Sequence, residues 1–330
     1  MNSRIVVLAS NSFAGSVFVS HALDAGHTVL GLSRSAEPDA VFLPYAGHPR
    51  AADFRFVRAD IRTELDKVCA ELAAFCPDYV VDFAGQGMVA ESWAAPEQWY
   101  ETNIVAKVKL HAFLRKQSWL KKYVRISTPE VYGSHEQLIG EDQPYRPSTP
   151  YAVSHSAIDM SVMAFHRNYG FPVVLGRFAN FYGPHQQLYR IVPRTIIYAR
   201  SGRKLQLHGG GTSVRAFIHA QDVARGIALM LEKGRPGEVY HFSPDSFVSI
   251  RQLVETLCVE LSVAFSDFVE VAGDRPGKDQ AYLMSAAKSR NELGWRDEVS
   301  LESGLSQSIA WVDRHWDKIC ALPLDYIHRP

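Results

Sequence analysis

The sequence predicts an α/β protein built around a doubly wound parallel sheet, and three observations support this fold class. Short apolar and β-branched runs alternate with stretches of helical spacing through the first half of the chain. These runs are continuously apolar, which is typical of strands buried on both faces of a parallel sheet. The chain has 330 residues, of which 47% are hydrophobic, enough for one large domain or two closely joined lobes.

The first elements form a βαβ unit. "RIVVLA" (4–9) predicts a buried strand, "AGSVFVSHALDAG" (14–26) an amphipathic helix that ends on Gly26, and "HTVLGLS" (27–33) a second strand. The same alternation continues through four further expected strands: "FRFVRAD" (54–60), "YVVDFAG" (79–85), "YVRIS" (123–127) and "PVVLGRF" (172–178).

The composition of the chain and the length of its expected elements change after residue 180. Glycine and proline punctuate shorter elements there, as in "LHGGGTSVRAF" (207–217) and "AGDRPGKD" (272–279). We therefore expect residues 1–178 to form the first domain and residues 179–330 mainly a smaller lobe. The helical stretch and strand within 219–243 are expected to return to the first domain.

Charge and composition exclude several classes of partner. Lys plus Arg and Asp plus Glu each total 35, so the chain offers no basic surface for nucleic acid and no polybasic membrane patch. No stretch approaches the roughly 20 apolar residues that cross a bilayer. The N-terminus lacks the pattern of a secretory signal. We expect a cytoplasmic protein with no nucleic-acid or membrane partner.

The cysteines carry no metal or disulfide pattern. The four residues include no Cys-x-x-Cys pair and are too few for a disulfide framework or structural zinc; they are Cys69, Cys76, Cys258 and Cys320. They are most simply interpreted as buried thiols in a reducing compartment, and no metal site is expected.

The turn after the first strand stands where a dinucleotide-binding fold holds its pyrophosphate. Ala9, Ser12 and Gly15 occupy a Gly-x-x-Gly-x-x-Gly spacing, of which only the third glycine is present. Small residues keep this passage open, and the hydroxyls of Ser10 and Ser12 could donate to phosphate. An ordinary strand-to-helix turn rich in capping residues is the alternative.

Residues at the ends of the second and third strands bear on cofactor choice. "SRS" places Ser33 and Arg34 where an NAD site has an acid for the ribose, and an arginine there suits a 2′-phosphate. NADP is therefore preferred over NAD, although Arg34 could instead be a solvated loop residue. Asp60 could accept from the adenine amino group or cap a helix.

Five longer motifs occur in order along nearly the whole chain: "STPEVYGS" (127–134), "EDQPYRPSTPYAVSHSAID" (141–159), "GRFANFYGPHQQ" (176–187), "GGGTSVRAFIHAQDVARG" (209–226) and "DRPGKDQAYLMSAAKSRNELGW" (274–295). On these motifs the sequence resembles the extended short-chain dehydrogenase/reductase family, and most of all its nucleotide-sugar dehydratases, typified by dTDP-glucose 4,6-dehydratase. The resemblance implies a Rossmann-type NAD(P)-binding domain and a C-terminal nucleotide-sugar-binding lobe. It also assigns Phe13, Ile61 and Ala84 to the cofactor site.

The resemblance implies that Tyr151 takes the proton of a sugar hydroxyl while the nicotinamide receives a hydride from the same carbon. Thr128 matches the threonine that hydrogen-bonds the reacting hydroxyl. His155 stands where the family has lysine, beside both the tyrosine and the cofactor. A histidinium could depress the pKa of the phenol, with slower or more acid-dependent turnover. Alternatively, His155 is a polar helix residue and the dyad is broken.

A second departure lies between Thr128 and Glu130. The related dehydratases carry Thr-Asp-Glu, so Glu130 keeps the role of the base at C5, whereas Pro129 leaves the acid role vacant. Water or another side chain could fill that role, or the enzyme could move only the C5 proton, as an epimerase would. Decarboxylases and epimerases of the family also vary at this position.

The remaining matches concern the substrate and the assembly. Asn180, Arg215 and Arg275 correspond to residues that grip the diphosphate, and Arg190 is a plausible addition. The nucleotide base is not readable from the sequence. Helices near 97–117 and 151–168 match the pair that forms a homodimer interface in relatives.

We therefore expect an NAD(P)-dependent enzyme acting on a nucleotide-diphosphate sugar, with dehydration after transient C4 oxidation as the leading reaction. The first alternative is an epimerase at C4 or C5. The second is a catalytically weakened binding protein, because two glycines, the lysine and the aspartate are replaced together.

Overall fold

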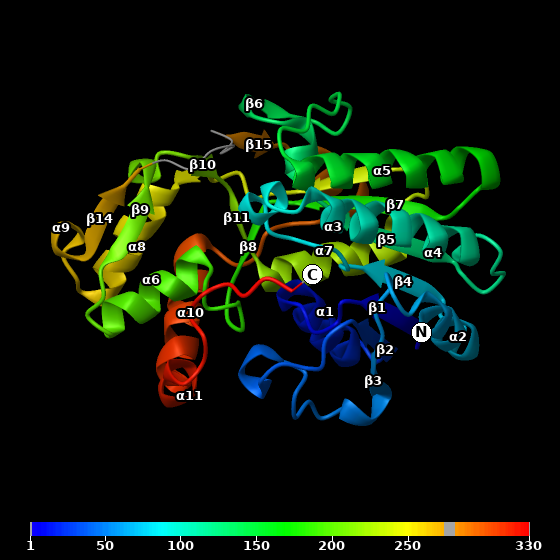
Figure 1. Ribbon diagram of the computed structural model, residues 1–330, viewed down its shortest axis with the longest axis horizontal. Helices are drawn as coiled ribbons and strands as arrows, with labels where there is room; N and C mark the ends of the chain where they lie inside the picture. Colours follow the sequence, from blue (N-terminus) through cyan, green and yellow to red (C-terminus); the bar gives the residue numbers. More distant parts are fainter. Residues whose placement is uncertain (1, 274–280, 330) are drawn as a thin grey trace.

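The computed structural model describes residues 2–273 and 281–329. Its centre is a seven-stranded sheet of order β12-β7-β5-β4-β1-β2-β3 (Figure 1), in which every neighbouring pair is parallel. The strands are β1 (Arg4–Leu8), β2 (Thr28–Ser33), β3 (Phe54–Arg58), β4 (Tyr79–Asp82), β5 (Lys122–Ser127), β7 (Val173–Phe178) and β12 (Val239–Phe242). This arrangement confirms the predicted fold class.

Helices cover both faces of this sheet. They are α1 (Phe13–Asp24), α2 (Leu65–Phe75), α3 (Pro96–Tyr100), α4 (Lys107–Leu114), α5 (Pro150–Tyr169) and α7 (Ala220–Lys233). One apolar cluster joins Phe18 of α1 and Ile227 of α7 to one face. A second joins Leu72, Leu110 and Val162, from α2, α4 and α5, to the other. Burial of these two clusters is the main stabilisation of the layered sandwich.

The helix expected near 97–117 is interrupted. Between α3 and α4, residues Glu101–Ala106 wind as a π-helix. The other short turns of helix are Ala40–Phe42, Ala51–Asp53, Ala90–Trp93, Pro129–Tyr132, Gly209–Gly211 and, again as a π-helix, Ser289–Leu293.

A second group of elements lies to one side of the sheet in Figure 1. Its helices are α6 (Ile191–Arg200), α8 (Ile250–Leu261), α9 (Phe265–Phe268), α10 (Leu301–Arg314) and α11 (Trp316–Cys320). Four two-stranded ladders complete the described structure: β9 (Leu205–His208) with β14 (Val269–Ala272), β10 (Val214–Arg215) with β13 (Val248–Ser249), β8 (Asn180–Tyr182) with β11 (Phe217–His219), and β6 (His135–Ile139) with β15 (Tyr282–Met284). Ile196, Leu257 and Trp311 share an apolar core of their own there.

Residues 220–242 connect the two groups. Helix α7 packs against α1, and β12 adds to the main sheet beside β7. These contacts support the expected return of residues 219–243 to the first domain. The division of the chain at residue 178 stays a prediction.

Residues 322–329, here called the returning segment, run from α11 back toward the centre of the molecule (Figure 1). The ring of His328 stacks on Trp99, with centroids 5.4 Å apart and planes at 4°. The side-chain amide of Gln86 donates to the carbonyl of Arg329 at 2.9 Å. The returning segment therefore joins the second group of elements to the loop after β4 and to α3.

Among the described residues, no helix is long and apolar enough to span a bilayer, and no group of histidine, cysteine and acidic side chains could hold a metal ion. The cysteines form no disulfide. Only Cys258 is buried as expected: Cys69 is half-buried, and Cys76 and Cys320 are exposed. Both lie at helix C-terminal ends, where the chain leaves the packed face of the helix.

Candidate active site

The candidate site lies where the parallel strands end. In a doubly wound sheet, ligands bind beyond the carboxyl ends of the strands at the point where the strand order reverses. Here the order reverses between β1 and β4. Ala9, Ala84 and Thr128 follow β1, β4 and β5 respectively, so the structure places these predicted residues at that edge.

The turn from β1 into α1, residues 9–15, keeps a glycine-like backbone although its first glycine is replaced. Ala9 has φ of +60°, a left-handed conformation that costs a non-glycine residue roughly 1–2 kcal/mol. Gly15 has no space for a side chain, because a Cβ atom there would lie 2.3 Å from the carbonyl oxygen of Ala9. The backbone of this turn fits a dinucleotide phosphate site.

The predicted donors of this turn are otherwise engaged. The Ser12 hydroxyl donates to the Ala9 carbonyl at 2.7 Å and accepts from the Gly15 amide at 3.2 Å. Ser10 is fully buried, and its Oγ lies 3.3 Å from Oγ of Ser33. Both hydroxyls therefore brace the turn, and a contact of either one with phosphate stays a prediction.

The donors that remain are backbone amides. Phe13 and Ala14 open helix α1, and the first N–H groups of a helix have no acceptor within it. A helix N-terminus with free amides is a favourable place for a phosphate anion.

The ribose end of the site shows two different outcomes. The Arg34 guanidinium donates to Oε1 of Gln86 at 3.5 Å, and the Arg34 carbonyl accepts from Arg58, so Arg34 reaches the loop after β4. The Asp60 carboxylate accepts from the Arg62 amide at 2.8 Å in the turn before α2. The N-cap of α2 is Glu64, so Asp60 does not cap that helix as the sequence alternative had it. Ile61 beside it is buried. A role for Asp60 with adenine stays a prediction.

Three predicted catalytic residues meet at the end of β5. The Glu130 amide donates to the Thr128 hydroxyl at 3.3 Å, and the Thr128 side chain hydrogen-bonds the phenol of Tyr151. Tyr151 stands in the first turn of α5, which Thr149 caps by accepting from the Ala152 amide. The cap fixes where α5 begins and so directs the phenol at Thr128 and Glu130.

The surroundings of Tyr151 oppose its ionisation. Burial raises the pKa of this phenol well above its usual value, and the Glu130 carboxylate raises it further. The hydrogen bond from Thr128 and the charges of Arg190 and Arg125 lower the pKa of Tyr151. Positive charge near the phenol is therefore what the base role requires.

His155 does not supply that charge. Its ring lies against Tyr151, with centroids 4.5 Å apart. Burial, followed by the Arg125 charge, holds the pKa of His155 well below its usual value. The histidinium expected from the sequence is therefore unsupported, and the imidazole is neutral near pH 7.

A buried ionic cluster that sequence reasoning missed lies beneath these residues. Asp159 accepts from Nε of Arg125 at 2.7 Å and from Nη2 of Arg177 at 3.1 Å. Its second oxygen also accepts from the Ser127 hydroxyl at 2.5 Å. Nη2 of Arg125 lies 3.2 Å from Nδ1 of His155, so the cluster touches the candidate active site.

The cluster continues to β4 and α4. Lys107 donates to the Asp82 carboxylate at 2.6 Å, and Nη1 of Arg125 lies 3.8 Å from the same group. A charged residue inside the apolar run "YVRIS" was the available sequence signal for Arg125. Asp159 lies one helical turn after His155, which was a second signal.

The predicted substrate residues come from several elements of the second group. Asn180 lies on β8, and Arg215 lies on β10 with its guanidinium 4.1 Å from the ring centre of Tyr282. Arg190 is exposed just before α6 and is close enough to act on the pKa of Tyr151. Arg275 lies outside the described residues. Phosphate contacts by these side chains stay a prediction.

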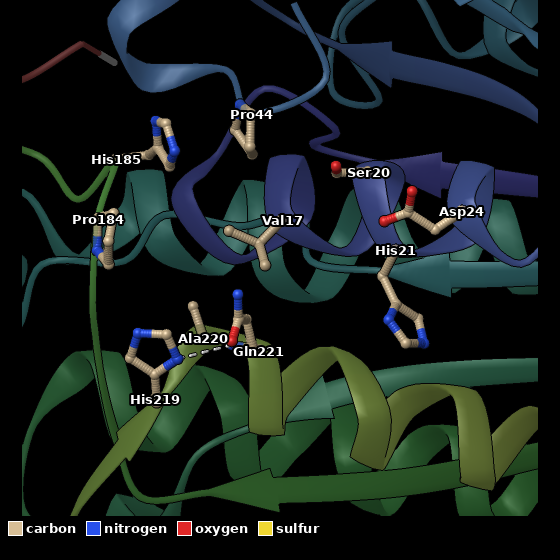
Figure 2. A pocket seen from close by; sticks show the side chains of 10 residues that line it. All are labelled: Val17, Ser20, His21, Asp24, Pro44, Pro184, His185, His219, Ala220 and Gln221. Carbon is tan, nitrogen blue, oxygen red and sulfur yellow. Dashed lines mark hydrogen bonds between the residues drawn. The ribbon is translucent and has the colours of Figure 1, made fainter. Parts of the chain in front are cut away.

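Two cavities of the described structure lie elsewhere. One of about 190 Å³ opens between α1, Pro44 and the chain from Pro184 to Gln221, and Figure 2 shows His21, His185 and His219 around it. The other, of about 420 Å³, is lined by residues such as Asp39, His315 and Lys318. Neither contains a predicted catalytic or cofactor residue, so the candidate site rests on the side-chain cluster around Tyr151.

Comparison with known proteins gives the same family. A family described as GDP-mannose 4,6 dehydratase matches residues 11–308. The chain is 34% identical to a dTDP-glucose 4,6-dehydratase of Streptomyces antibioticus over 328 residues, which cover 95% of this chain and 94% of that protein.

Solved structures agree. The dTDP-glucose 4,6-dehydratase of Streptomyces venezuelae, solved with NAD, has a TM-score of 0.88 and 32% identity, covering 96% of this chain and 98% of that one. The UDP-glucose 4-epimerase of Thermotoga maritima, solved with UDP-glucose, has a TM-score of 0.87 and 25% identity, covering 95% and 99%. These similarities confirm the predicted family and enzyme class, and the chain belongs to the nucleotide-sugar dehydratases of the extended short-chain dehydrogenase/reductase family.

Proposed function

We propose that this protein removes water from a nucleotide-diphosphate hexose after transient oxidation at C4. The observation that supports the proposal most is the meeting of Thr128, Glu130 and Tyr151 at one point of the sheet edge. When bound, a nicotinamide dinucleotide accepts a hydride from the sugar and returns it at the end. The turn at residues 9–15 and the amides of Phe13 and Ala14 would hold its phosphates.

Each protein group has one task in this reaction. The Tyr151 phenolate accepts the proton of the C4 hydroxyl, and Thr128 orients that hydroxyl by a hydrogen bond. The carbonyl formed at C4 acidifies the hydrogen on C5, which Glu130 removes. The departing C6 hydroxyl needs a proton, and buried Pro129 has none to give. Glu130, protonated by the C5 hydrogen, can return that proton to the C6 oxygen, so that one carboxyl serves both transfers and water leaves. When the hydride returns to C6, Glu130, reprotonated from water, would give C5 its proton. C4 stays a carbonyl, and Tyr151 releases its proton to solvent.

An epimerase is the second candidate, and Pro129 is the observation that favours it. Without a dedicated acid for the C6 hydroxyl, the same oxidation and C5 deprotonation could end in reprotonation on the opposite face. The likeness to a UDP-glucose 4-epimerase structure is consistent with either outcome.

The deciding experiment is incubation of the purified protein with NADP⁺ or NAD⁺ and a panel of dTDP-, UDP-, GDP- and CDP-hexoses, followed by mass and NMR analysis of the products. Loss of one water supports the dehydratase. An unchanged mass with altered stereochemistry supports the epimerase. Binding of the sugars without any turnover would contradict both.

We also propose NADP as the preferred cofactor. Arg34 reaches the loop after β4, and Arg58 at the end of β3 donates to the Arg34 carbonyl. Two guanidinium groups near the ends of β2 and β3 are what supports a 2′-phosphate there. Calorimetric titration should give tighter binding of NADP⁺ than of NAD⁺. Arg34→Ala should weaken NADP⁺ binding about tenfold and NAD⁺ binding little, since each lost charge-assisted contact is worth about 1–2 kcal/mol. Equal losses for both would contradict the preference.

A cytoplasmic homodimer completes the proposal. The exposed apolar side chains Val105, Val153 and Met160 lie between α3 and α4 and on α5, the helices expected to form the interface. Figure 1 shows α4 and α5 side by side along one face of the sheet. Light scattering after gel filtration should give twice the monomer mass, and Met160→Glu should yield monomers.

A further inference from the structure

If Tyr151 acts as the base of the proposed function, a nearby positive charge must stabilise its phenolate, and neutral His155 does not supply that charge. Among the described residues, the ionisable groups that face the phenol or its immediate neighbours are Asp82 on β4, Lys107 on α4, Arg125 on β5, Glu130 after β5, His155 and Asp159 on α5, and Arg190 before α6. Of these, Glu130 opposes ionisation of the phenol, and Arg190 and Arg125 favour it.

The contact between Arg125 and His155 defines the state of the histidine. A guanidinium nitrogen can only donate a hydrogen bond, so Nδ1 of His155, 3.2 Å from Nη2 of Arg125, must accept with a lone pair. An imidazolium has no such lone pair. The ring is therefore neutral and carries its single proton on Nε2.

The buried cluster holds a positive charge in excess. Arg125, Arg177 and Lys107 are its three cations, and Asp159 and Asp82 are its two carboxylates. All five side chains are at most 1% exposed. Near neutral pH, three positive charges against two negative ones leave one positive charge, in a region of low dielectric where its field acts strongly. Burial lowers the pKa of Lys107 to about 8, so above that pH the two arginines and the two carboxylates balance and only the arginine charges are permanent.

We propose that Arg125 is a positioning residue for the dehydration. It fixes His155 as the neutral Nε2–H tautomer and adds, from behind the histidine, a permanent positive charge to that of Arg190, so that the two cations together favour the Tyr151 phenolate. In this arrangement Arg125 does not touch the substrate side of Tyr151, and His155 transmits orientation but no charge. The proposal rests on the proposed function for its kinetic test, but not for its spectroscopic test.

The kinetic test is the pH dependence of kcat/KM for whichever nucleotide sugar is turned over. The rate should rise with pH as Tyr151 ionises. Arg125→Met should move the rising limb upward by roughly half a pH unit, because the 1–3 units of an adjacent opposite charge are reduced when the cation lies behind His155 and ranks after Arg190 in its effect on Tyr151. Arg125→Lys should restore most of that shift, and His155→Lys in the Arg125→Met background should also return the limb toward the wild-type position.

Arg177 offers the matched control. It is fully buried on β7 and binds the same carboxylate of Asp159, but its hydrogen bonds go to Tyr132 and Tyr145 instead of His155. Arg177→Met should lower stability yet leave the rising limb within about 0.3 units. A limb unchanged in folded Arg125→Met, or moved equally by Arg177→Met, would overturn the proposal.

The spectroscopic test needs no substrate. In ¹⁵N-histidine-labelled wild-type protein, with His155→Gln for assignment, Nδ1 of His155 should resonate as an unprotonated acceptor and Nε2 as a protonated nitrogen from pH 6 to 8. A protonated Nδ1 would refute the proposal even if Arg125→Met failed to fold. If no nucleotide sugar were turned over, the proposed function would fail, while this measurement would still decide the tautomer.

Discussion

The turn at residues 9–15 and the cluster around Tyr151 lie at the same edge of the sheet but keep their chemistry by different means. The turn contains no ionisable side chain, and its shape is held by backbone conformation and two braced serines. The cluster around Tyr151 depends on the placement of buried charges. Replacement of the first glycine by Ala9 therefore leaves a local backbone strain in the turn. Replacement of the lysine by His155 removes a positive charge near Tyr151, and Arg125 on the neighbouring strand β5 carries a positive charge nearby.

The largest expected effect is on the pH dependence of stability, to which the cluster around Tyr151 contributes through His155 and the turn at residues 9–15, which has no ionisable side chain, contributes nothing. Burial lowers the pKa of His111 to about 3 and that of His219 to about 4, and it holds the pKa values of His155 and His241 well below the usual 6.5. The unfolded chain therefore binds more protons than the native protein below pH ~6.5, and stability falls as the pH falls.

Urea unfolding should show this loss. At pH 5.5 each histidine costs about 1.4 kcal/mol relative to neutral pH, so the four together cost about 5 kcal/mol. Between pH 8 and 7 the free energy of unfolding should change by less than about 1 kcal/mol. A loss under about 1 kcal/mol on going from pH 7.5 to 5.5 would show that these side chains are not buried as neutral groups.

Removing the phenol should have the next largest effect. Tyr151→Phe should lower kcat about 10³-fold, since general-base catalysis is worth 10²–10⁴, and should leave cofactor affinity within about twofold because the turn at residues 9–15 is untouched. Tyr169→Phe, on the same helix but 61% exposed, is the control and should be active. Substantial turnover by Tyr151→Phe would show that another residue is the base for the C4 hydroxyl.

Glu130→Gln tests the second proton transfer. The variant should turn over about 10²-fold more slowly, and in D₂O the wild-type product should carry deuterium at C5, read by mass spectrometry and NMR. Removal of the negative charge should also shift the rising limb of the kcat/KM profile to lower pH, because Glu130 raises the pKa of Tyr151. Wild-type rates in Glu130→Gln would exclude this carboxylate as the C5 base.

The smallest effect belongs to the turn. Ala9→Gly should raise the free energy of unfolding by roughly 0.5–1 kcal/mol, because relief of the left-handed strain exceeds the entropy added to the unfolded chain. Ala14→Gly, in the first turn of α1, should have the opposite sign and a similar size. Chemical denaturation measures both. Destabilisation by Ala9→Gly would mean that φ at this residue is negative in solution.

The strands were predictable because each is a compact apolar run, but their ends were less so. The run at 79–85 stops as a strand at Asp82, since the Asp82 carboxylate accepts from the amide of Ala84 and turns the chain. Tyr151, Glu130 and Thr128 were found through the resemblance of their motifs to those of the family, and the structure brings them together.

Other parts of the site could not be obtained from the sequence. A spacing pattern identifies the hydroxyls of Ser10 and Ser12, but not that the Ser33 hydroxyl lies within hydrogen-bond distance of Ser10 or that the Ala9 carbonyl accepts from Ser12. A spacing pattern likewise shows Arg125 only as one residue of a strand, because the partners of Arg125 on α5, His155 and Asp159, come 30 and 34 residues later. Long-range pairing of polar groups is decided by tertiary packing, which local patterns do not encode.

The returning segment implies an order of events during synthesis. The hydrogen-bond partner of the Gln86 side-chain amide is the carbonyl of Arg329, 243 positions later in the chain. The partner of Gln98 is the ring of His328, 230 positions later. The ribosome synthesises the strands of the sheet, the helices on both of its faces and Tyr151 well before it synthesises His328 and Arg329. The contacts of the returning segment with the loop after β4 and with α3 therefore form last. A nascent chain halted before residue 322 would have a formed sheet but would lack these contacts beside the carboxyl ends of its strands.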